Sequence, residues 1–319
     1  MQKVFVPRDG QLATFPDYHS AHAQLPQAPV CWVDLVDPAP KELAGLAELG
    51  LTDQVLADAL DWENRPAVRE LPEVTAVTFR IFQCQPGEVG LDVRPLQVLI
   101  VPPVVVTVRP CPDRWIAQLQ DEVARHPRLL SSVGHLVYLV LDAVVDGHFP
   151  ALDDLEDRLD ALDEEILERA STSALPRINE IKRMLLAIRR AIIPERDATN
   201  FLLLDRPDYL SERDLDDLRD LQYRTLQVIE LADTYRDLLG NSLDAYMANV
   251  SNRLNEVMKV LTMVATVMLP LTLVVGFYGT NFARTWPPYE APWGAAAIFL
   301  GMAATAGLML WWFRRKGWM

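Results

Sequence analysis

The chain has 319 residues and a formal net charge of −14, which is enough length for one sizeable soluble domain and a further segment. The acidic balance argues against nucleic-acid binding, which requires basic patches, and it suits the attraction of cations. Three widely spaced cysteines, Cys31, Cys84 and Cys111, form no C-x-x-C pair, and we interpret them as reduced packing residues.

The sequence offers no recognisable catalytic motif. It contains neither a glycine-rich phosphate loop nor a nucleophile elbow, so we predict no enzymatic activity and no organic substrate. Residues 1–30 hold no apolar segment, and we expect no cleavable signal. His19 and His22 with Cys31 resemble a metal cluster, but no fourth ligand follows at a suitable spacing, so we expect no site there.

The first part of the chain mixes strand and helix signals. Short β-branched runs predict strands at Val30–Val36, Val74–Phe82, Leu96–Val101 and Val104–Val108. Short helices are predicted at Lys41–Leu49 and Gln54–Trp62. We therefore expect an α/β domain over residues 1–150, with its strand order left open.

Residues 151–210 predict an acidic helical hairpin. In the first helix, apolar residues recur at steps of three and four, at Leu152, Leu155, Leu159, Leu162 and Ile166. Acidic residues crowd its other faces: Asp153, Asp154, Glu156, Asp157, Asp160, Asp163, Glu164, Glu165 and Glu168. A second helix is expected to begin at Pro176, because proline suits a first helical position. The acidic face is either a solvated surface or a means of gathering cations.

The longest predicted element begins at Ser211, where Ser211 and Asp214 resemble a capping box. No proline follows before Pro270, so one helix of about 100 Å is possible. Pro270 is expected to bend or loosen it, because proline lacks a backbone donor.

Two uncharged stretches predict membrane spans. After Lys259 no charge appears until Arg284, and a second uncharged run covers residues 291–313; each exceeds the roughly 20 residues that cross a bilayer. We divide this region into a stalk helix and first span (211–282), an extracytoplasmic loop (283–290), and a second span with a basic tail (291–319). Bases flank the spans away from that near-neutral loop, which places both termini in the cytosol: Arg253, Lys259, Arg314, Arg315 and Lys316.

Small and polar residues recur on one face of the first span and its stalk. This face, the seam, comprises Asp244, Ala248, Ser251, Asn255, Met258, Thr262, Ala265, Leu269, Thr272, Gly276 and Gly279. Such a face either packs against another helix or lines a water-filled path. The glycines and the amide of Asn281 at the membrane edge favour the second interpretation, with the glycines loosening the helix.

Several motifs resemble the CorA family of divalent-cation channels. They are Ser251–Thr262, Leu269–Thr272 and Tyr278–Phe282, with a basic tail after the second span and a looser match at Trp32–Pro38. The family signature is Tyr-Gly-Met-Asn-Phe, and this chain has Thr280 in place of the Met. The resemblance covers nearly the whole chain and is strongest from about Ser211. It implies an α+β fold in a homopentameric funnel in the cytoplasmic (inner) membrane, with the first spans around one pore.

The resemblance also implies roles for individual residues. At the outer mouth, Asn281 with Gly279 and Thr280 would capture a hydrated Mg²⁺, which prefers oxygen ligands and sheds water reluctantly. Further oxygen atoms and close approaches would come from Thr272, Gly276, Asn255 and Asp244. Apolar rings of Met258, Leu261 and Leu269 would close the pore by dewetting. Co²⁺ and Ni²⁺ are expected as further cargo.

Related channels are thought to close when Mg²⁺ bridges an acid on the stalk to one in the neighbouring subunit. Asp220 matches the stalk acid, but its partner position falls near Gln85, which is neutral. Glu88 or Asp92 would have to substitute, so we expect a sensor of lower affinity than usual.

Two alternatives to a magnesium channel remain. The first is a Zn²⁺ transporter similar to ZntB, which shares the fold. The departure from the family signature at Thr280 is compatible with this alternative, although no histidine or cysteine lies in the first span. A membrane-tethered helical scaffold would explain the helices but would not need Asn281.

Overall fold

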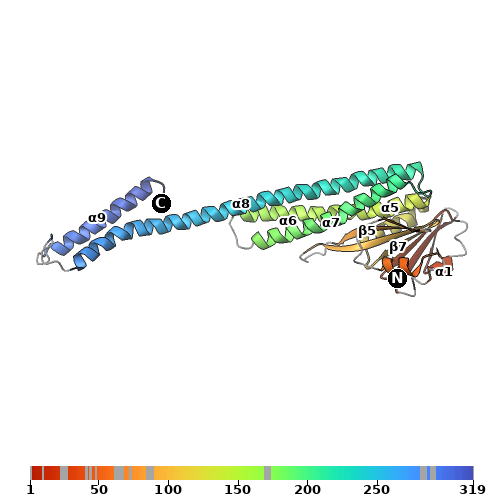
Figure 1. Cartoon of the computed structure of the whole chain (residues 1–319), viewed down its shortest axis with the longest axis horizontal. Coiled ribbons are helices and arrows are strands. Elements are labelled where there is room, and N and C mark those ends of the chain that lie inside the picture. The colour runs from red at the N-terminus through yellow and green to blue at the C-terminus, as the bar shows by residue number, and fades with distance from the viewer. Residues whose placement is uncertain are drawn as a thin grey trace. The chain divides into compact units, whose positions relative to one another are not determined.

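The computed structural model describes residues 2–8, 11–21, 28–39, 42, 45–46, 49–60, 68–71, 74–83, 90–168, 174–280, 286–287 and 292–318. The chain forms two compact units, an N-terminal unit (Met1–Leu243) and a C-terminal unit (Asp244–Met319). One helix, α8 (Glu212–Gly279), contributes to both units (Figure 1).

The N-terminal unit is built on a seven-stranded sheet in the order β2-β1-β3-β7-β6-β5-β4. The strands are β1 (Gln2–Arg8), β2 (Gln11–Phe15), β3 (Cys31–Val36), β4 (Val68–Leu71), β5 (Val74–Gln83), β6 (Asp92–Val101) and β7 (Val104–Arg109). Only the β3–β7 pair is parallel among the described pairs, and the others are antiparallel. The central strands are rich in valine, and β7 is buried along its whole length, as expected for a strand covered on both faces.

The four predicted strands are confirmed, with small changes at their ends. Strand β6 begins at Asp92, four residues before the predicted Leu96, because its polar first part continues the pairing with β5 as far as Gln83. Strands β1, β2 and β4 were not predicted. Both β2 and β4 are edge strands, and β2 has no buried residue, so neither has the apolar alternation that marks a strand.

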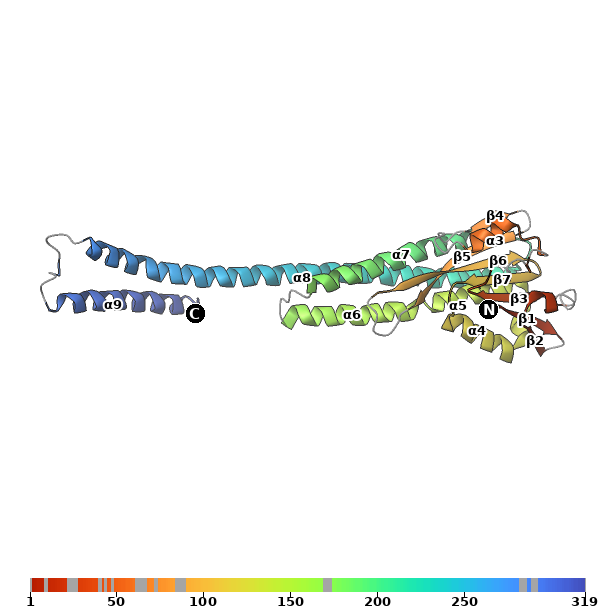
Figure 2. The ribbon, with the colours of Figure 1, turned by 90° about the horizontal axis from the view of Figure 1, so that it is seen from below.

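The helices of the N-terminal unit follow in chain order. Besides the first part of α8, the described ones are α1 (Tyr18–Ala21), α3 (Asp53–Ala59), α4 (Arg114–Arg125), the short 3-10 helix η3 (Pro127–Leu129), α5 (Val133–Asp146), α6 (Phe149–Glu168) and α7 (Ala174–Asp205). The predicted helix Gln54–Trp62 is present as α3, which ends at Ala59. Most of the predicted helix Lys41–Leu49 lies outside the described residues. Figure 2 shows the green α7 running alongside α8.

The acidic hairpin forms as predicted. All five predicted apolar positions of α6 are at most 3% exposed, and they pack toward α7. Helix α7 begins at Ala174, so the expectation that Pro176 is the first helical residue was wrong. Pro176 still lies in the first turn, where its missing N–H breaks no helical bond. The predicted capping box is confirmed, because Ser211 Oγ accepts from Asp214 N at 3.3 Å and the Asp214 carboxylate accepts from Ser211 N at 2.9 Å.

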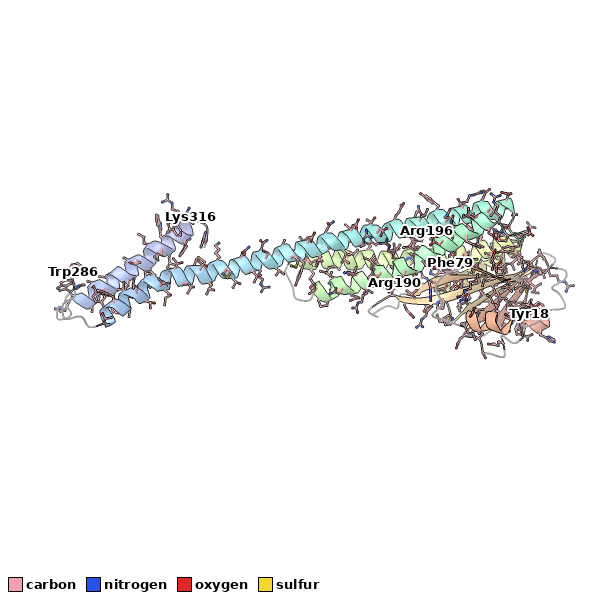
Figure 3. All side chains as sticks on the ribbon, in the orientation of Figure 1. Tyr18, Phe79, Arg190, Arg196, Trp286 and Lys316 are labelled. Atoms are coloured by element: carbon pink, nitrogen blue, oxygen red, sulfur yellow. The ribbon has the colours of Figure 1, made fainter. Side chains whose placement is uncertain are left out.

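Two buried polar networks stabilise the N-terminal unit around its apolar core, which includes Phe79 (Figure 3). In the first, Asp34 on β3 accepts hydrogen bonds from Arg109 and Thr107 on β7 and from Gln120 on α4. In the second, Glu195 on α7 contacts His148, between α5 and α6, and the backbone of β5. These networks satisfy charges that would otherwise be costly to bury.

Among the described residues, three stretches of helix are long and apolar enough to cross a membrane. Two are α8 and α9 (Gly294–Arg315), whose most apolar parts are 0% and 6% buried. The third, Val133–Leu167, has 56% of its most apolar part buried within the N-terminal unit. Its apolar side chains face the protein core, and we assign it to that core.

Candidate functional site

The C-terminal unit is a helical hairpin with the chemistry of a membrane element at both ends. The step from Lys259 to Tyr278 corresponds to about 28 Å of helix, close to the thickness of a bilayer core. Figure 3 places Trp286 and Lys316 at opposite ends of this hairpin. At the basic end, Lys259 Nζ donates to Gly317 O at 3.3 Å. Tryptophans stand near both ends, as is usual for membrane interfaces: Trp286, Trp293, Trp311, Trp312 and Trp318.

One face of α8 turns toward α9. Pro270, Leu271, Val274 and Tyr278 line an apolar cavity of about 490 Å³. Its other wall comes from α9 and the loop before it: Trp286, Pro287, Trp293, Ala297, Ile298, Gly301, Met302 and Thr305. Tyr278 also donates its hydroxyl to Trp286 O at 2.6 Å, which ties the end of α8 to the loop. This face of α8 is therefore occupied within the chain.

The predicted seam lies on the opposite face of α8. At 100° per residue, the seam positions centre on the side of the helix away from Pro270 and Val274. The apolar seam members Met258 and Leu269 are 58% and 71% exposed, and Leu261, a predicted gate residue outside the seam, is 60% exposed. Thr280, which follows the seam, is exposed, and so are its polar and small members: Asp244, Asn255, Thr272, Gly276 and Gly279. A contiguous face with these residues is thus left without a partner within the described part of this unit.

The hydroxyls of Thr272, in the seam, and Thr280, just after it, bond to their own helix. Thr272 Oγ1 donates to Met268 O at 2.9 Å, and Thr280 Oγ1 donates to Phe277 O at 2.6 Å. Each oxygen keeps lone pairs that can accept from a water molecule. A Cβ added at Gly276 or Gly279 would meet no heavy atom within 4 Å, so the glycines leave open space beside these oxygens.

Helix α8 continues through Pro270 and Gly276 and ends at Gly279. The expectation that Pro270 and the glycines loosen this helix stays a prediction. Helical membrane segments tolerate proline and glycine where neighbouring groups satisfy the backbone. Two predicted site residues, Asn281 and Glu88, lie outside the described residues, as does Gln85.

The predicted regulatory residue Asp220 is exposed on α8, in the N-terminal unit. One turn later, Arg224 donates to Asp142 and Asp146 of α5. Burial raises the pKa of the Asp142 carboxyl, while the Arg224 guanidinium opposes that rise. Sequence reasoning missed this contact. The only signal was the four-residue spacing of the two α5 acids on an otherwise apolar helix.

The structure also places part of the cysteine and histidine set. Cys31 lies at the start of β3, fully buried, and burial raises the pKa of its thiol to about 12. A thiol held protonated is a poor metal ligand. His19 lies in α1, whereas His22 and Cys84 are outside the described residues.

Comparisons with known proteins agree with this arrangement. The family model described as "CorA-like Mg2+ transporter protein" matches residues 27–315. The chain is 30% identical over 276 residues to the cobalt/magnesium transport protein CorA of Thermotoga maritima, covering 85% of this chain and 77% of that protein. It is 23% identical over 296 residues to the zinc transport protein ZntB of Pectobacterium atrosepticum, covering 91% of this chain and 88% of that protein.

A solved structure shares the whole fold. The complete structure of the CorA magnesium transporter from Methanocaldococcus jannaschii superposes with a TM-score of 0.88 at 22% identity, covering 100% of this chain and 99% of that chain. The predicted fold class, an α/β domain followed by long helices and two apolar C-terminal helices, is therefore confirmed.

Proposed function

Because the chain belongs to the family of CorA-like Mg²⁺ transporters, which are membrane proteins and not enzymes, we propose that this divalent-cation transporter carries Mg²⁺, with Co²⁺ and Ni²⁺ as further cargo. The observation that carries this proposal is the unpartnered seam on α8, opposite the face that α9 covers. A face lined by hydroxyl, amide and carboxylate oxygens suits a hydrated Mg²⁺, which prefers oxygen ligands.

The seam forms a closed path only if several chains bring it together. We propose a homopentamer in the cytoplasmic membrane in which five α8 seams surround one pore, with α9 outside them. The basic end of the hairpin then faces the cytosol, and both termini lie there. The exposed members support this arrangement, because glycine and threonine at Gly276 and Thr272 allow helices to approach closely in a membrane.

Individual roles follow from position along α8. Asn281, Gly279 and Thr280 lie at the loop end of the hairpin, where they would hold the hydrated ion as it enters. Thr272, Asn255 and Asp244 supply oxygen atoms at successive depths, while Met258, Leu261 and Leu269 supply the apolar constrictions. Asp220 and Glu88, of which Glu88 lies outside the described residues, are the proposed sensor of cytosolic Mg²⁺. We propose the domain division given above: the α/β domain (1–150), the acidic hairpin (151–210), the stalk helix and first span (211–282), the extracytoplasmic loop (283–290), and the second span with its basic tail (291–319).

Zinc transport is the second candidate. Thr280 departs from the family signature, and a zinc transport protein aligns over 91% of this chain. Against it, no histidine or cysteine lies between Lys259 and Arg284, so the span offers no imidazole or thiolate ligand.

Ion uptake into liposomes by the purified protein tests this proposal. Mg²⁺, Co²⁺, Ni²⁺ and Zn²⁺ are compared in parallel for the wild type, Asn281→Ala and the control Asn252→Ala, which lies off the seam. We expect Mg²⁺ uptake by the wild type and the control. Asn281→Ala should fall to background while the oligomer persists by size-exclusion chromatography. Uptake of Zn²⁺ alone would favour the second candidate, and no uptake of any ion would favour a scaffold.

A further inference from the structure

The first turns of α5 and α8 meet in the N-terminal unit, far along the chain from the seam. Ser132 Oγ accepts from His135 N at 3.0 Å to cap α5, and it donates to Asp214 Oδ1 at 3.5 Å. A Cβ at Gly134 would come within 2.5 Å of Asp214 Oδ2. Only glycine therefore admits this carboxylate between the two helix ends, where Asp214 is 2% exposed.

Three potential metal ligands converge at this junction. His135, Asp214 and Asp217 each offer one ligand atom, and all three atoms lie within 4.8 Å of one another. His135 Nδ1 lies 3.4 Å from Asp217 Oδ2, which is longer than a good N–H···O hydrogen bond. Two ligands about 2.0–2.1 Å from one tetrahedral ion lie about 3.3–3.4 Å apart, so this pair already has the spacing of a coordination edge.

The local charge favours a cation. Asp214, Asp217 and Asp220 recur at steps of three on one face of the first turns of α8, where Arg213 also lies. When Arg213 and roughly +0.5 charge from each of the two helix N-termini are counted against these three carboxylates, a charge of about −1 remains. The nearby Arg224 does not balance this charge, because its guanidinium is engaged by Asp142 and Asp146.

A neighbouring tyrosine packs against His135. The ring of Tyr138 stacks on that of His135, with centroids 5.9 Å apart. This contact limits the rotation of the imidazole, whose Nδ1 lies 3.4 Å from Asp217 Oδ2.

We propose that His135, Asp214 and Asp217 bind one transition-metal dication of the Zn²⁺ or Co²⁺ class, with water completing its coordination. An imidazole nitrogen beside two carboxylates suits these ions, whereas Mg²⁺ prefers oxygen ligands alone. The bound ion would join α5 to the first turn of α8. The chain would then hold two chemically different ion sites, an all-oxygen seam for cargo and a mixed nitrogen and oxygen site in the N-terminal unit.

Metal binding by the full-length protein tests the proposal independently of transport. The protein, purified in detergent without a polyhistidine tag, is dialysed against micromolar Zn²⁺ in the presence of millimolar Mg²⁺, which occupies all-oxygen sites. We expect one Zn²⁺ per chain, and at least tenfold weaker binding in His135→Gln and Asp217→Asn. Matched controls are His126→Gln and Asp216→Asn, two exposed positions close in sequence, which should bind as the wild type does.

Two further measurements keep the test decisive. X-ray absorption of the bound ion should include scattering from one imidazole, and Zn²⁺ should raise the melting temperature of the wild type even if a variant folds poorly. No Zn²⁺ binding in the micromolar range, binding that survives both substitutions, or an oxygen-only shell would each overturn the proposal. Because no flux is measured, failure of the proposed Mg²⁺ transport would leave this result unaffected.

Discussion

Replacing Glu195 with alanine should destabilise the N-terminal unit severely. The Glu195 carboxylate is fully buried on α7, where Oε1 accepts from Arg80 N at 2.6 Å and Oε2 lies 2.9 Å from His148 Nε2. His148 is also fully buried, and the ring of Phe82 lies against it with a centroid distance of 4.1 Å. One side chain thus joins β5, the connection between α5 and α6, and α7.

The size of the effect follows from what is left behind. In Glu195→Ala, the Arg80 N–H and His148 Nε2 both lose their partner in a site without solvent. Removing one member of a buried pair costs about 3–5 kcal/mol. For a unit of this length, each kcal/mol lowers the melting temperature by about 2–4 °C, so we expect a decrease of roughly 6–20 °C.

Thermal unfolding followed by tryptophan fluorescence in detergent measures this change. The control is Asp197→Asn, two residues along the same helix and 61% exposed, which should change stability by less than about 0.5 kcal/mol. Glu195→Gln should be intermediate, because its amide oxygen can accept from Arg80 N and its amide nitrogen still lies beside His148 Nε2. If Glu195→Ala lowers the melting temperature by less than about 2 °C, the contacts of this carboxylate with β5 and His148 do not stabilise the unit as we argue.

Three further substitutions test the proposed pore and its surroundings. Met258→Asp should wet the constriction and raise ion leak at high Mg²⁺, as conductance would measure. Asp220→Ala should give a channel that stays open as internal Mg²⁺ is raised in current recordings. Arg224→Gln should lower the melting temperature more than Arg219→Gln does, because Arg224 contacts the partly buried Asp142 while Arg219 contacts an exposed carboxylate.

Each of these has a clear contrary result. If Met258 faces lipid, the aspartate should impair insertion or assembly at a cost of about 3 kcal/mol, and a sizing profile would reveal this without leak. Identical Mg²⁺ inhibition in wild type and Asp220→Ala would remove Asp220 from the sensor. Equal melting temperatures for the two arginine variants would mean that the Arg224 contacts contribute little.

Local sequence patterns correctly predicted the helices that have a regular apolar repeat, an N-terminal capping motif or a long uncharged run. The apolar stripe of α6, the capping box at Ser211 and the two uncharged spans were all found, because each is decided by residues close together in the sequence. The edge strands β2 and β4 were missed, since exposed strands carry no alternation. Helix α7 continues through Pro194, where tertiary packing outweighs the loss of one backbone bond.

Long-range contacts were beyond the reach of periodicity. His135 and Asp217 lie on helices separated by α6 and α7, so no spacing rule pairs them, and the sequence drew attention to His19 and Cys31 instead. The opposite placement of the seam and the α9 contact face was within reach, because both follow from the 3.6-residue period of one helix. The roles of Asn281 and the other pore residues stay predictions.

The exposed seam also bears on how this protein is made. A newly inserted chain presents to lipid a face of threonine and glycine, at positions such as Thr272 and Gly276, that offers acyl chains little apolar surface and suits close approach by another helix. In the proposed homopentamer, the neighbouring copies cover this face. By mass action, the proposed assembly would then depend on the concentration of chains in the membrane more steeply than in direct proportion.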